Sequence, residues 1–453
     1  MRKIRIYLSI VLIAMSFLSL AQDQRNAIDS LFIKLENADD NSKIEILNTI
    51  SQKYWDLSLD SSLYFANEAL NLAHIVQDKK GISDAYNRIG NVYSFKGESD
   101  LALEFYNKCL RLRLEMGDSK GITNIHHNIA FEYEAQNNFE EAINNFQKAL
   151  DESIKREDDS DIITYLSSIA RIYLEQSKYR NALEYYLKAL EKAKKINLLE
   201  NMANIYNGMG NVYFEISNYD ESLKYYLNAL EIYKNNEDRS GISASYNNLG
   251  ILYQSLQDND KALEYYQKTL AMDIESGDKL GQANAYNNIG TAYDEKGDKQ
   301  KALEYYNKSL AINQEIKYED GIATALNNIG LIYLDLGDYY KSYTNLKKSA
   351  EMTREANDIY SLANNHNNLA KLFLRQKQYV QAQNNLNIAI ELSKQINVKE
   401  WLVESYDLYH QLYSELNNYK KALEYYKLYT EINDSIYTIE STNRVTEMKV
   451  KYE

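Results

Sequence analysis

The sequence contains no proline among its 453 residues, and its 16 glycines are spread along the chain. No stretch is therefore typical of a Pro-rich spacer or a Gly/Ser hinge between domains. A chain of this length exceeds what one compact hydrophobic core can organise, so it forms either several domains or an extended array of repeats. The absence of linkers favours the array, and helix is the secondary structure that tolerates this composition best.

Cysteine is also scarce, because Cys109 is the only one, and this excludes a disulfide within the chain. Positive charge is outnumbered: 51 Lys and Arg stand against 65 Asp and Glu, which gives a formal net charge of -14. Such a chain repels the phosphate backbone of a nucleic acid. We therefore expect no nucleic-acid partner, and a neutral or basic protein or peptide is favoured.

Only one stretch is strongly apolar, and it lies at the N-terminus. Basic residues precede an apolar run from Ile6 to Leu20, and Ser19 and Ala21 occupy the small-residue positions of a cleavage site. This order is typical of a secretory signal peptide over residues 1–21. The run is shorter than the roughly 20 residues of a membrane-spanning helix, so an uncleaved anchor is the weaker alternative. We expect an exported chain that faces the periplasm or the cell surface.

The chain repeats itself with a period of forty residues, without gaps, from Gly81 to Glu440. The units begin at Gly81, Gly121, Asp161, Asn201, Gly241, Gly281, Gly321, Ser361 and Trp401. With a degenerate unit from Asn41, residues 41–440 are predicted to hold ten repeats, of which the first and last are degenerate. Residues 22–40 are expected to add an N-terminal capping helix, and residues 441–453 a C-terminal helical tail.

Within a unit the apolar residues follow helical spacing in two blocks. In the unit from Gly281 these are Tyr286, Ile289, Gly290 and Tyr293, then Ala302, Leu303, Tyr306 and Leu310. Gly297 suits the left-handed residue that ends the first helix, and Asp298 begins the turn before the second. Each unit is thus a helical hairpin, which buries both apolar stripes only by stacking on its neighbours.

These recurring residues resemble the signature of the tetratricopeptide repeat. A small residue followed three later by tyrosine marks the first helix, at Gly90, Gly210, Gly250, Gly290 and Gly330. An alanine with an aromatic residue four positions on marks the second, as at Ala102, Ala142, Ala182, Ala262, Ala302 and Ala422. The resemblance implies an all-α, right-handed superhelical solenoid of stacked antiparallel helix pairs. The chain lacks the family's closing proline and exceeds its usual repeat length, so it is more similar to the long-repeat adaptors and longer helices are expected.

Tyrosines come in adjacent pairs along the second helices: Tyr185 and Tyr186, Tyr225 and Tyr226, Tyr265 and Tyr266, and Tyr305 and Tyr306. The second of each pair matches the family's core aromatic residue. We expect the first to pack against the next repeat, with exposure on an interaction surface as the alternative.

Motifs of catalytic and cofactor-binding proteins are missing, so we expect no enzyme, no cofactor and no metal. His126 and His127 are adjacent and point about 100° apart on a helix, which suits them poorly to share a metal ion. His126 takes the place of an aromatic residue in other units, and Cys109 takes that of a small one. Both are interpreted as packed side chains.

What remains is a face of the first helices that is rich in asparagine, at the fourth, seventh and eleventh positions of the units. We predict as binding residues Asn87, Asn204, Asn207, Asn211, Asn247, Asn284, Asn287, Asn327, Asn364 and Asn367. In the family this face lines the concave surface of the superhelix. An amide offers both donors and an acceptor, which an extended polypeptide backbone requires. The alternative is that these amides bond to neighbouring repeats and serve packing.

The sequence thus indicates a non-enzymatic scaffold that binds a polypeptide segment in the concave groove. Under this hypothesis, substituting Asn247, Asn287 and Asn327 by alanine abolishes binding and leaves the thermal melt nearly unchanged. The alternative function is the extracytoplasmic sensing region of a longer membrane-anchored histidine kinase or transcriptional regulator, because the charged tail resembles the exit helix of such sensors. Membrane contact is expected only through an uncleaved signal or a further C-terminal segment.

Overall fold

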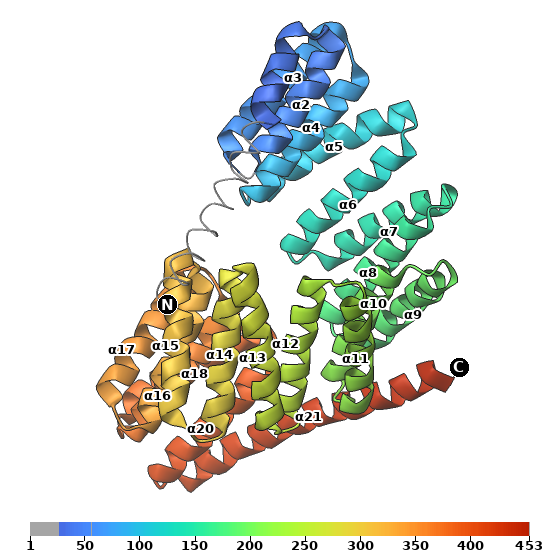
Figure 1. Cartoon of the computed structure of the whole chain (residues 1–453). Coiled ribbons are helices and arrows are strands. Elements are labelled where there is room, and N and C mark those ends of the chain that lie inside the picture. The colour runs from blue at the N-terminus through green and yellow to red at the C-terminus, as the bar shows by residue number, and fades with distance from the viewer. Residues whose placement is uncertain (1–26, 56, 453) are drawn as a thin grey trace, which may run out of the picture. The chain divides into compact units, whose positions relative to one another are not determined.

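The computed structural model describes residues 27–55 and 57–452, with side chains as far as residue 435. The predicted signal peptide lies outside these residues. Throughout the described part, helices alternate with short turns and no strand occurs, as the sequence predicted (Figure 1). None of the helices found there has the length and apolar character needed to cross a lipid bilayer.

The chain divides into two compact units, residues 1–195 and 196–453. In the first, a helix over residues 27–37 precedes α2 (Asp40–Tyr54), α3 (Leu59–Val76), α4 (Lys79–Phe95), α5 (Ser99–Met116), α6 (Ser119–Ala135), α7 (Phe139–Lys155), α8 (Asp159–Glu175) and α9 (Tyr179–Lys195). The second contains α10 (Leu199–Glu215), α11 (Tyr219–Asn235), α12 (Arg239–Ser255), α13 (Asn259–Ser276), α14 (Lys279–Glu295), α15 (Lys299–Ile316), α16 (Glu319–Asp335), α17 (Tyr339–Glu355), α18 (Ile359–Arg375), α19 (Tyr379–Gln395), α20 (Lys399–Glu415) and α21 (Tyr419–Tyr452).

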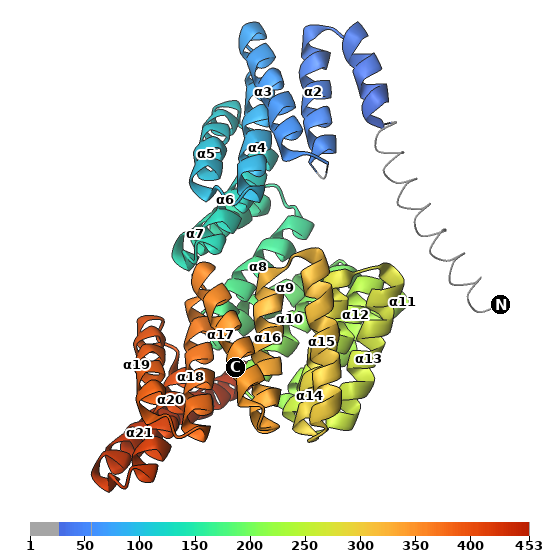
Figure 2. The same ribbon diagram turned by 90° about the vertical axis from the view of Figure 1, so that its left-hand side faces the viewer.

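Within each unit the helices form stacked antiparallel pairs, and each helix packs against the one before and the one after it (Figure 2). The even-numbered helices are the first helices of the repeats, and several of them also contact the first helix of the following repeat, as α14 does with α16. The fold is therefore an all-α solenoid of tetratricopeptide-like hairpins. These contacts between first helices bring the asparagine-rich positions of adjacent repeats together.

Left-handed residues and aspartate caps form the turns in this proline-free chain. Gly297 has a φ of 80°, and the side chain of Asp298 accepts a hydrogen bond from the backbone N–H of Lys301 at 3.1 Å, which confirms the predicted turn. At the same position other repeats place non-glycine residues with positive φ, such as Asn137 and Ser177. Asparagine tolerates this conformation better than most residues.

A glycine of the first helix packs against a tyrosine of the second in several repeats. A Cβ on Gly290 would lie 2.7 Å from the ring of Tyr306, and a Cβ on Gly250 would collide with the ring of Tyr266. Tyr266 and Tyr306 are both buried, as expected for the second residue of each tyrosine pair. The signature glycine is therefore needed for close approach of the two helices and not for backbone freedom.

The first tyrosine of each pair lies elsewhere than expected. Tyr265 stacks on Tyr253 with ring centres 5.5 Å apart, and it also contacts Tyr246. Both partners belong to the first helix of the same repeat, so the expectation that this tyrosine packs on the next repeat is wrong. The ammonium of Lys268 lies 4.8 Å from the ring centre of Tyr265, which closes the stack with a cation–π contact.

At most repeat junctions, the size of a residue late in the second helix is matched by the size of the residue that opens the next repeat. A Cβ on Gly241 would collide with the ring of Tyr233, and one on Gly281 would lie 2.7 Å from Asp273 Oδ2. Gly121 and Gly321 face Arg113 and Asn313 in the same way. Where the late residue is small, the next repeat opens without glycine, in the pairs Ser153 and Asp161, Thr353 and Ser361, and Ser393 and Trp401. Gly81 is an exception, because Ile44 fills its space.

The two ends of the described chain differ. At the N-terminal end, Ile28 is buried, and Phe32 contacts Phe65 of α3 with ring centres 5.6 Å apart. At the other end, α21 runs for 34 residues, whereas the other second helices have 17 or 18. The second helix of the last repeat and the predicted tail are thus one continuous helix.

Candidate functional site

Asparagine side chains join the first helices of successive repeats in the second unit. The seventh-position amide oxygen of one repeat accepts a hydrogen bond from the eighth-position Nδ2 of the next. These bonds, which we call the amide ladder, are Asn248 to Asn207 at 2.8 Å, Asn288 to Asn247 at 3.0 Å, Asn328 to Asn287 at 2.9 Å and Asn368 to Asn327 at 2.9 Å. The first unit has one equivalent bond, from Asn128 to Asn87 at 3.0 Å.

The amide ladder supports the packing alternative for the side-chain oxygen of each seventh-position asparagine. This oxygen is already bonded, so the structure leads us to expect that alanine substitution lowers the melting temperature, and not that the melt stays nearly unchanged. The Nδ2 groups of Asn207, Asn247 and Asn287 are different, because they donate to no partner within the described residues, and the three side chains are only partly buried. These N–H groups are available to a ligand.

The other predicted asparagines differ in whether their side chains form hydrogen bonds. Asn284 is exposed and has no hydrogen bond to another described residue. The oxygen of Asn204 accepts from Tyr233 at 2.6 Å, and that of Asn211 accepts from Tyr226 at 2.8 Å. Asn364 accepts from Asn368 at 3.3 Å. Tyrosines of the second helices thus orient part of the asparagine face.

Asn367 does not line a surface at all. It is 0% exposed, and its Nδ2 donates to the Trp401 carbonyl at 3.1 Å while its oxygen accepts from Ser405 at 2.7 Å. It joins α18 to α20 where the last repeat lacks the asparagine pair. Its place in the structure is that of a buried connector.

The eighth-position asparagines were missed from the sequence. They are Asn128, Asn248, Asn288, Asn328 and Asn368, and four of them follow a seventh-position asparagine directly. The recurring Asn-Asn dipeptide was the signal that could have identified them. Two adjacent helical residues point about 100° apart, so one amide can face the groove while the other reaches the preceding repeat.

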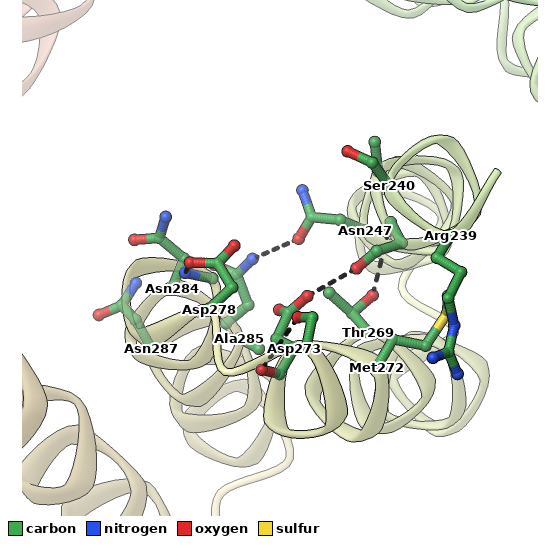
Figure 3. A pocket seen from close by; sticks show the side chains of 15 residues that line it. Arg239, Ser240, Asn247, Thr269, Met272, Asp273, Asp278, Asn284, Ala285 and Asn287 are labelled. Carbon is green, nitrogen blue, oxygen red and sulfur yellow. Dashed lines mark hydrogen bonds between the residues drawn. The ribbon is translucent and has the colours of Figure 1, made fainter. Parts of the chain in front are cut away.

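A pocket of about 680 Å³ opens beside the amide ladder, between α12, α13 and α14. Ser240 and Asn247 of α12 line one side, and Asn284 and Asn287 of α14 the other (Figure 3). Thr269, Met272 and Asp273 of α13 form its floor. Three predicted binding asparagines, Asn247, Asn284 and Asn287, therefore meet at one cavity.

Asp273 is the buried acid of this pocket. It is 5% exposed, and its Oδ1 accepts a hydrogen bond from the Ser243 hydroxyl at 2.8 Å. Burial raises the pKa of Asp273 above its usual value; the bond from Ser243 opposes this, and the nearby Asp278 carboxylate adds to it. A carboxylate that is costly to bury is kept here with one neutral partner.

We expect Asp273→Asn to stabilise the fold at pH 7 by roughly 1 kcal/mol. Because the folded state binds a proton at Asp273 more tightly than the unfolded state does, stability falls as pH rises through that raised pKa. The gain should therefore disappear below the ordinary aspartate pKa of 3.8. Urea unfolding at pH 3 and pH 7 measures it, and a variant less stable than wild type at pH 7 contradicts the expectation.

Charged groups around Asp273 leave its charge uncompensated. Arg239 lines the pocket, but its guanidinium pairs with Glu275 at 2.5 Å. Asp278 adds a second carboxylate, and its Oδ1 accepts from the backbone N–H of Gly281 at 2.9 Å. Lys279, the next residue, pairs with Glu315 at 3.5 Å.

The histidines and the cysteine lie in packed surroundings. His126 is buried with its Nδ1 3.0 Å from Asn145 Oδ1, and His127 packs against Phe131 with ring centres 4.7 Å apart. Burial lowers the pKa of both imidazoles. Cys109 is fully buried 3.2 Å from the Ser83 hydroxyl, and burial raises the pKa of its thiol. These surroundings are those of core residues.

A stack of two-helix repeats, joined through the first helices and hollowed beside them, defines a helical-repeat protein. The model of the tetratricopeptide repeat matches residues 81–151, 121–195, 201–275, 241–315, 321–395 and 361–435. The chain therefore belongs to the tetratricopeptide repeat family, as its residues indicated. No curated protein sequence matches it.

Solved structures share the fold at low sequence identity. RapI in its apo form is 18% identical, with a TM-score of 0.51 over 61% of this chain and 99% of that one. A Rap protein complexed with competence and sporulation factor is 16% identical, with a TM-score of 0.50 over 88% and 99%. A signal transduction ATPase with numerous domains and a tetratricopeptide repeat sensor, from Pyrococcus horikoshii, is 14% identical, with a TM-score of 0.55 over 80% of this chain and 55% of that one.

Proposed function

We propose that this chain is an exported, non-enzymatic scaffold that holds a polypeptide segment along the asparagine-lined face of its second unit. The observation that carries the proposal is the set of unbonded Nδ2 groups of Asn207, Asn247 and Asn287 on successive first helices. Each amide is fixed through its oxygen, so its donors are held in place before a ligand arrives. Preorganised donors lose little side-chain entropy on binding.

The geometry suits an extended backbone. Adjacent helices lie roughly 9 Å apart and an extended chain rises about 3.3 Å per residue, so one asparagine meets about every third ligand residue. Amide donors recognise backbone carbonyls irrespective of the ligand's side chains. Similarity to a Rap protein complexed with a competence and sporulation factor is compatible with a ligand on this fold.

Two matched triple variants test the proposal. Asn207, Asn247 and Asn287→Ala remove three bonds of the amide ladder together with the groove-facing donors. Asn248, Asn288 and Asn328→Ala also remove three of its bonds but leave the seventh-position donors in place. Both variants should lose stability by roughly 1 kcal/mol per hydrogen bond.

Binding is measured on peptides selected by the purified wild-type chain from a random twelve-residue phage library, using fluorescence anisotropy. We expect the seventh-position variant to lose affinity at least tenfold and the eighth-position variant to lose much less. Equal losses in both variants would assign the asparagines to packing alone. Failure of the wild-type chain to enrich any peptide would contradict the proposed function itself.

Export is supported by the basic, apolar and small-residue order of residues 1–21. A second candidate function, the sensing region of a longer signalling protein, is favoured by the length of α21. This helix continues to Tyr452 without a break at the end of the last repeat. The gene sequence beyond Glu453 distinguishes the two: a membrane-spanning segment followed by an output domain supports the sensor, and a stop codon supports the scaffold.

A further inference from the structure

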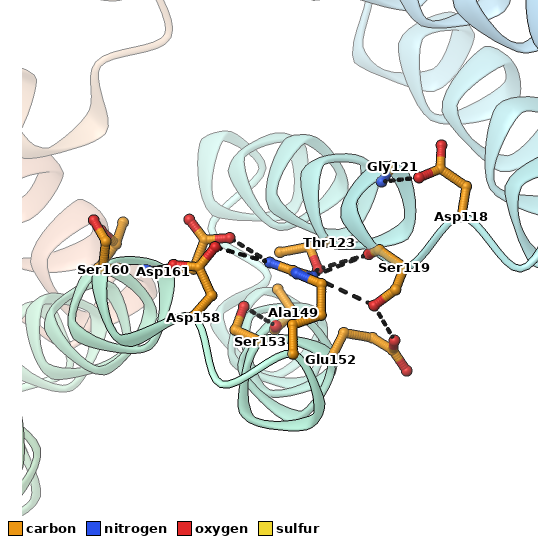
Figure 4. Close-up of polar contacts among 12 residues, drawn as sticks. Asp118, Ser119, Gly121, Thr123, Ala149, Glu152, Ser153, Asp158, Ser160 and Asp161 are labelled. Atoms are coloured by element: carbon orange, nitrogen blue, oxygen red, sulfur yellow. Dashed lines mark hydrogen bonds and ion pairs between the residues drawn. The ribbon is translucent and has the colours of Figure 1, made fainter.

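In the first unit, two arginines near the C-terminal ends of second helices form ion pairs with carboxylates of the chain itself. Arg113, late in α5, forms ion pairs with Asp84 and Asp118. Arg156 bonds to the Asp161 carboxylate and to the Thr123 hydroxyl, each at 2.6 Å, and it also donates to Ser119 (Figure 4). An arginine side chain thus fills the space between α6, α7 and the start of α8.

Asp273 occupies in α13 the repeat position that Arg113 occupies in α5. Here the chain supplies no countercharge: Asp273 forms no ion pair within the described residues, and its only side-chain hydrogen bond there comes from Ser243. Among the residues whose side chains the structure describes, one other carboxylate is as deeply buried, that of Glu132 in the first unit. Asp273 lines the pocket between α12, α13 and α14.

The rest of the pocket suits a cation better than an anion. The guanidinium of Arg239 is held by Glu275, and Asp278 brings a second carboxylate to the lining. Ser240, Asn247 and Asn284 surround the mouth with neutral oxygen and nitrogen atoms that can replace water around an ammonium or guanidinium group. Gly281 leaves the approach to Asp273 Oδ2 open, because any Cβ there would lie 2.7 Å from this oxygen.

We propose that this pocket takes a lysine or arginine side chain of the polypeptide held on the asparagine face, with Asp273 as its counter-ion. The inference rests on the proposed function and specifies the ligand: a basic residue is required at one position, and the amide donors tolerate other side chains around it. A pocket of about 680 Å³ accommodates a long side chain with its neighbouring backbone. A bound cation would form with Asp273 the kind of ion pair that Arg156 forms with Asp161.

The chain contains its own control for this proposal. One repeat later the equivalent residue is Asn313, which is also buried and also faces a glycine, Gly321. Asp273→Asn therefore places an asparagine against Gly281. The fold already accommodates this pair one repeat later, where Asn313 faces Gly321. The converse change, Asn313→Asp, places a carboxylate beside the next rung of the amide ladder, where Oδ1 of Asn313 is buried without a hydrogen-bond partner.

The experiment selects twelve-residue peptides from a random phage library on the full chain and on Asp273→Asn. Wild type should enrich peptides with lysine or arginine at one fixed position, and Asp273→Asn should lose that preference while still enriching peptides. In anisotropy measurements, replacing the selected basic residue by norleucine should weaken binding to wild type about tenfold or more and leave binding to Asp273→Asn unchanged. The double variant Asp273→Asn, Asn313→Asp should regain a basic residue at a shifted position.

The outcomes separate the two proposals. Enrichment of peptides with no basic position, or a basic preference that persists in Asp273→Asn, overturns the role of Asp273 and leaves the proposed function standing. If neither protein enriches any peptide, both proposals fail together. Circular dichroism melts of each variant verify that it is folded before the selections are compared.

Discussion

Tyr266→Ala should lower the free energy of unfolding by about 4 kcal/mol, the upper range for truncating a buried aromatic residue. Tyr266 is 1% exposed and is the largest fully buried side chain of the described chain. Its ring fills the space left by Gly250, and its hydroxyl donates to Gln254 Oε1 at 2.8 Å. Alanine would leave a cavity against a glycine, which has no side chain to move into it.

The neighbouring tyrosine provides the control for this measurement. Tyr265 is partly exposed and stacks on Tyr253 at the surface of the repeat. Tyr265→Ala should therefore cost about 1 kcal/mol, the contribution of an exposed aromatic pair. Urea unfolding followed by far-ultraviolet circular dichroism compares the midpoints of the two variants. Similar midpoints for both would show that Tyr266 and Gly250 do not form the core of the hairpin.

Asn367→Ala should cost about 3 kcal/mol, although it removes only a small polar group. Both atoms of the amide are bonded in a fully buried place, to Ser405 at 2.7 Å and to the Trp401 carbonyl at 3.1 Å. Alanine would leave the Trp401 carbonyl with the remaining bonds from within its own helix and would remove the link between α18 and α20. The variant loses two buried hydrogen bonds, each contributing about 1 kcal/mol, together with the packing contacts of a fully buried side chain.

Asn364→Ala is the matched control, three residues earlier on the same helix. Asn364 is partly exposed and accepts one bond of 3.3 Å from Asn368, so we expect a loss of about 0.5 kcal/mol. Thermal unfolding of the two variants, followed by circular dichroism, gives the comparison. Equal melting temperatures would contradict the assignment of Asn367 as a buried connector.

The sequence was sufficient to predict the hairpin, its turn and the family. The period of forty and the spacing of Tyr286, Ile289 and Tyr293 indicate a helix face, and Gly297 marks its end. Each of these signals is local, because helix periodicity and turn preference act within a few residues. Their repetition in phase made the prediction stronger than any single copy.

The partners of each asparagine could not be predicted in this way. Which amide of Asn247 and Asn248 faces the preceding repeat depends on the rotation between two neighbouring first helices, and this rotation is set by packing of the whole repeat. The first tyrosine of each pair was misplaced for the same reason. Asp273 was missed because a buried acid in a single repeat has no periodicity, and only its surroundings in three helices distinguish it.

The matching of sizes at most junctions has a consequence for how such an array can grow or shrink in evolution. Duplicating or deleting a forty-residue unit creates a junction that is new in sequence, and the late residue must then match the opening residue of its new neighbour. Joining Tyr233 to Gly281 preserves the match, whereas joining it to Ser361 puts a side chain where the tyrosine ring needs glycine. One repeat can therefore replace another only where its opening residue and its late residue match those of the new neighbours in size.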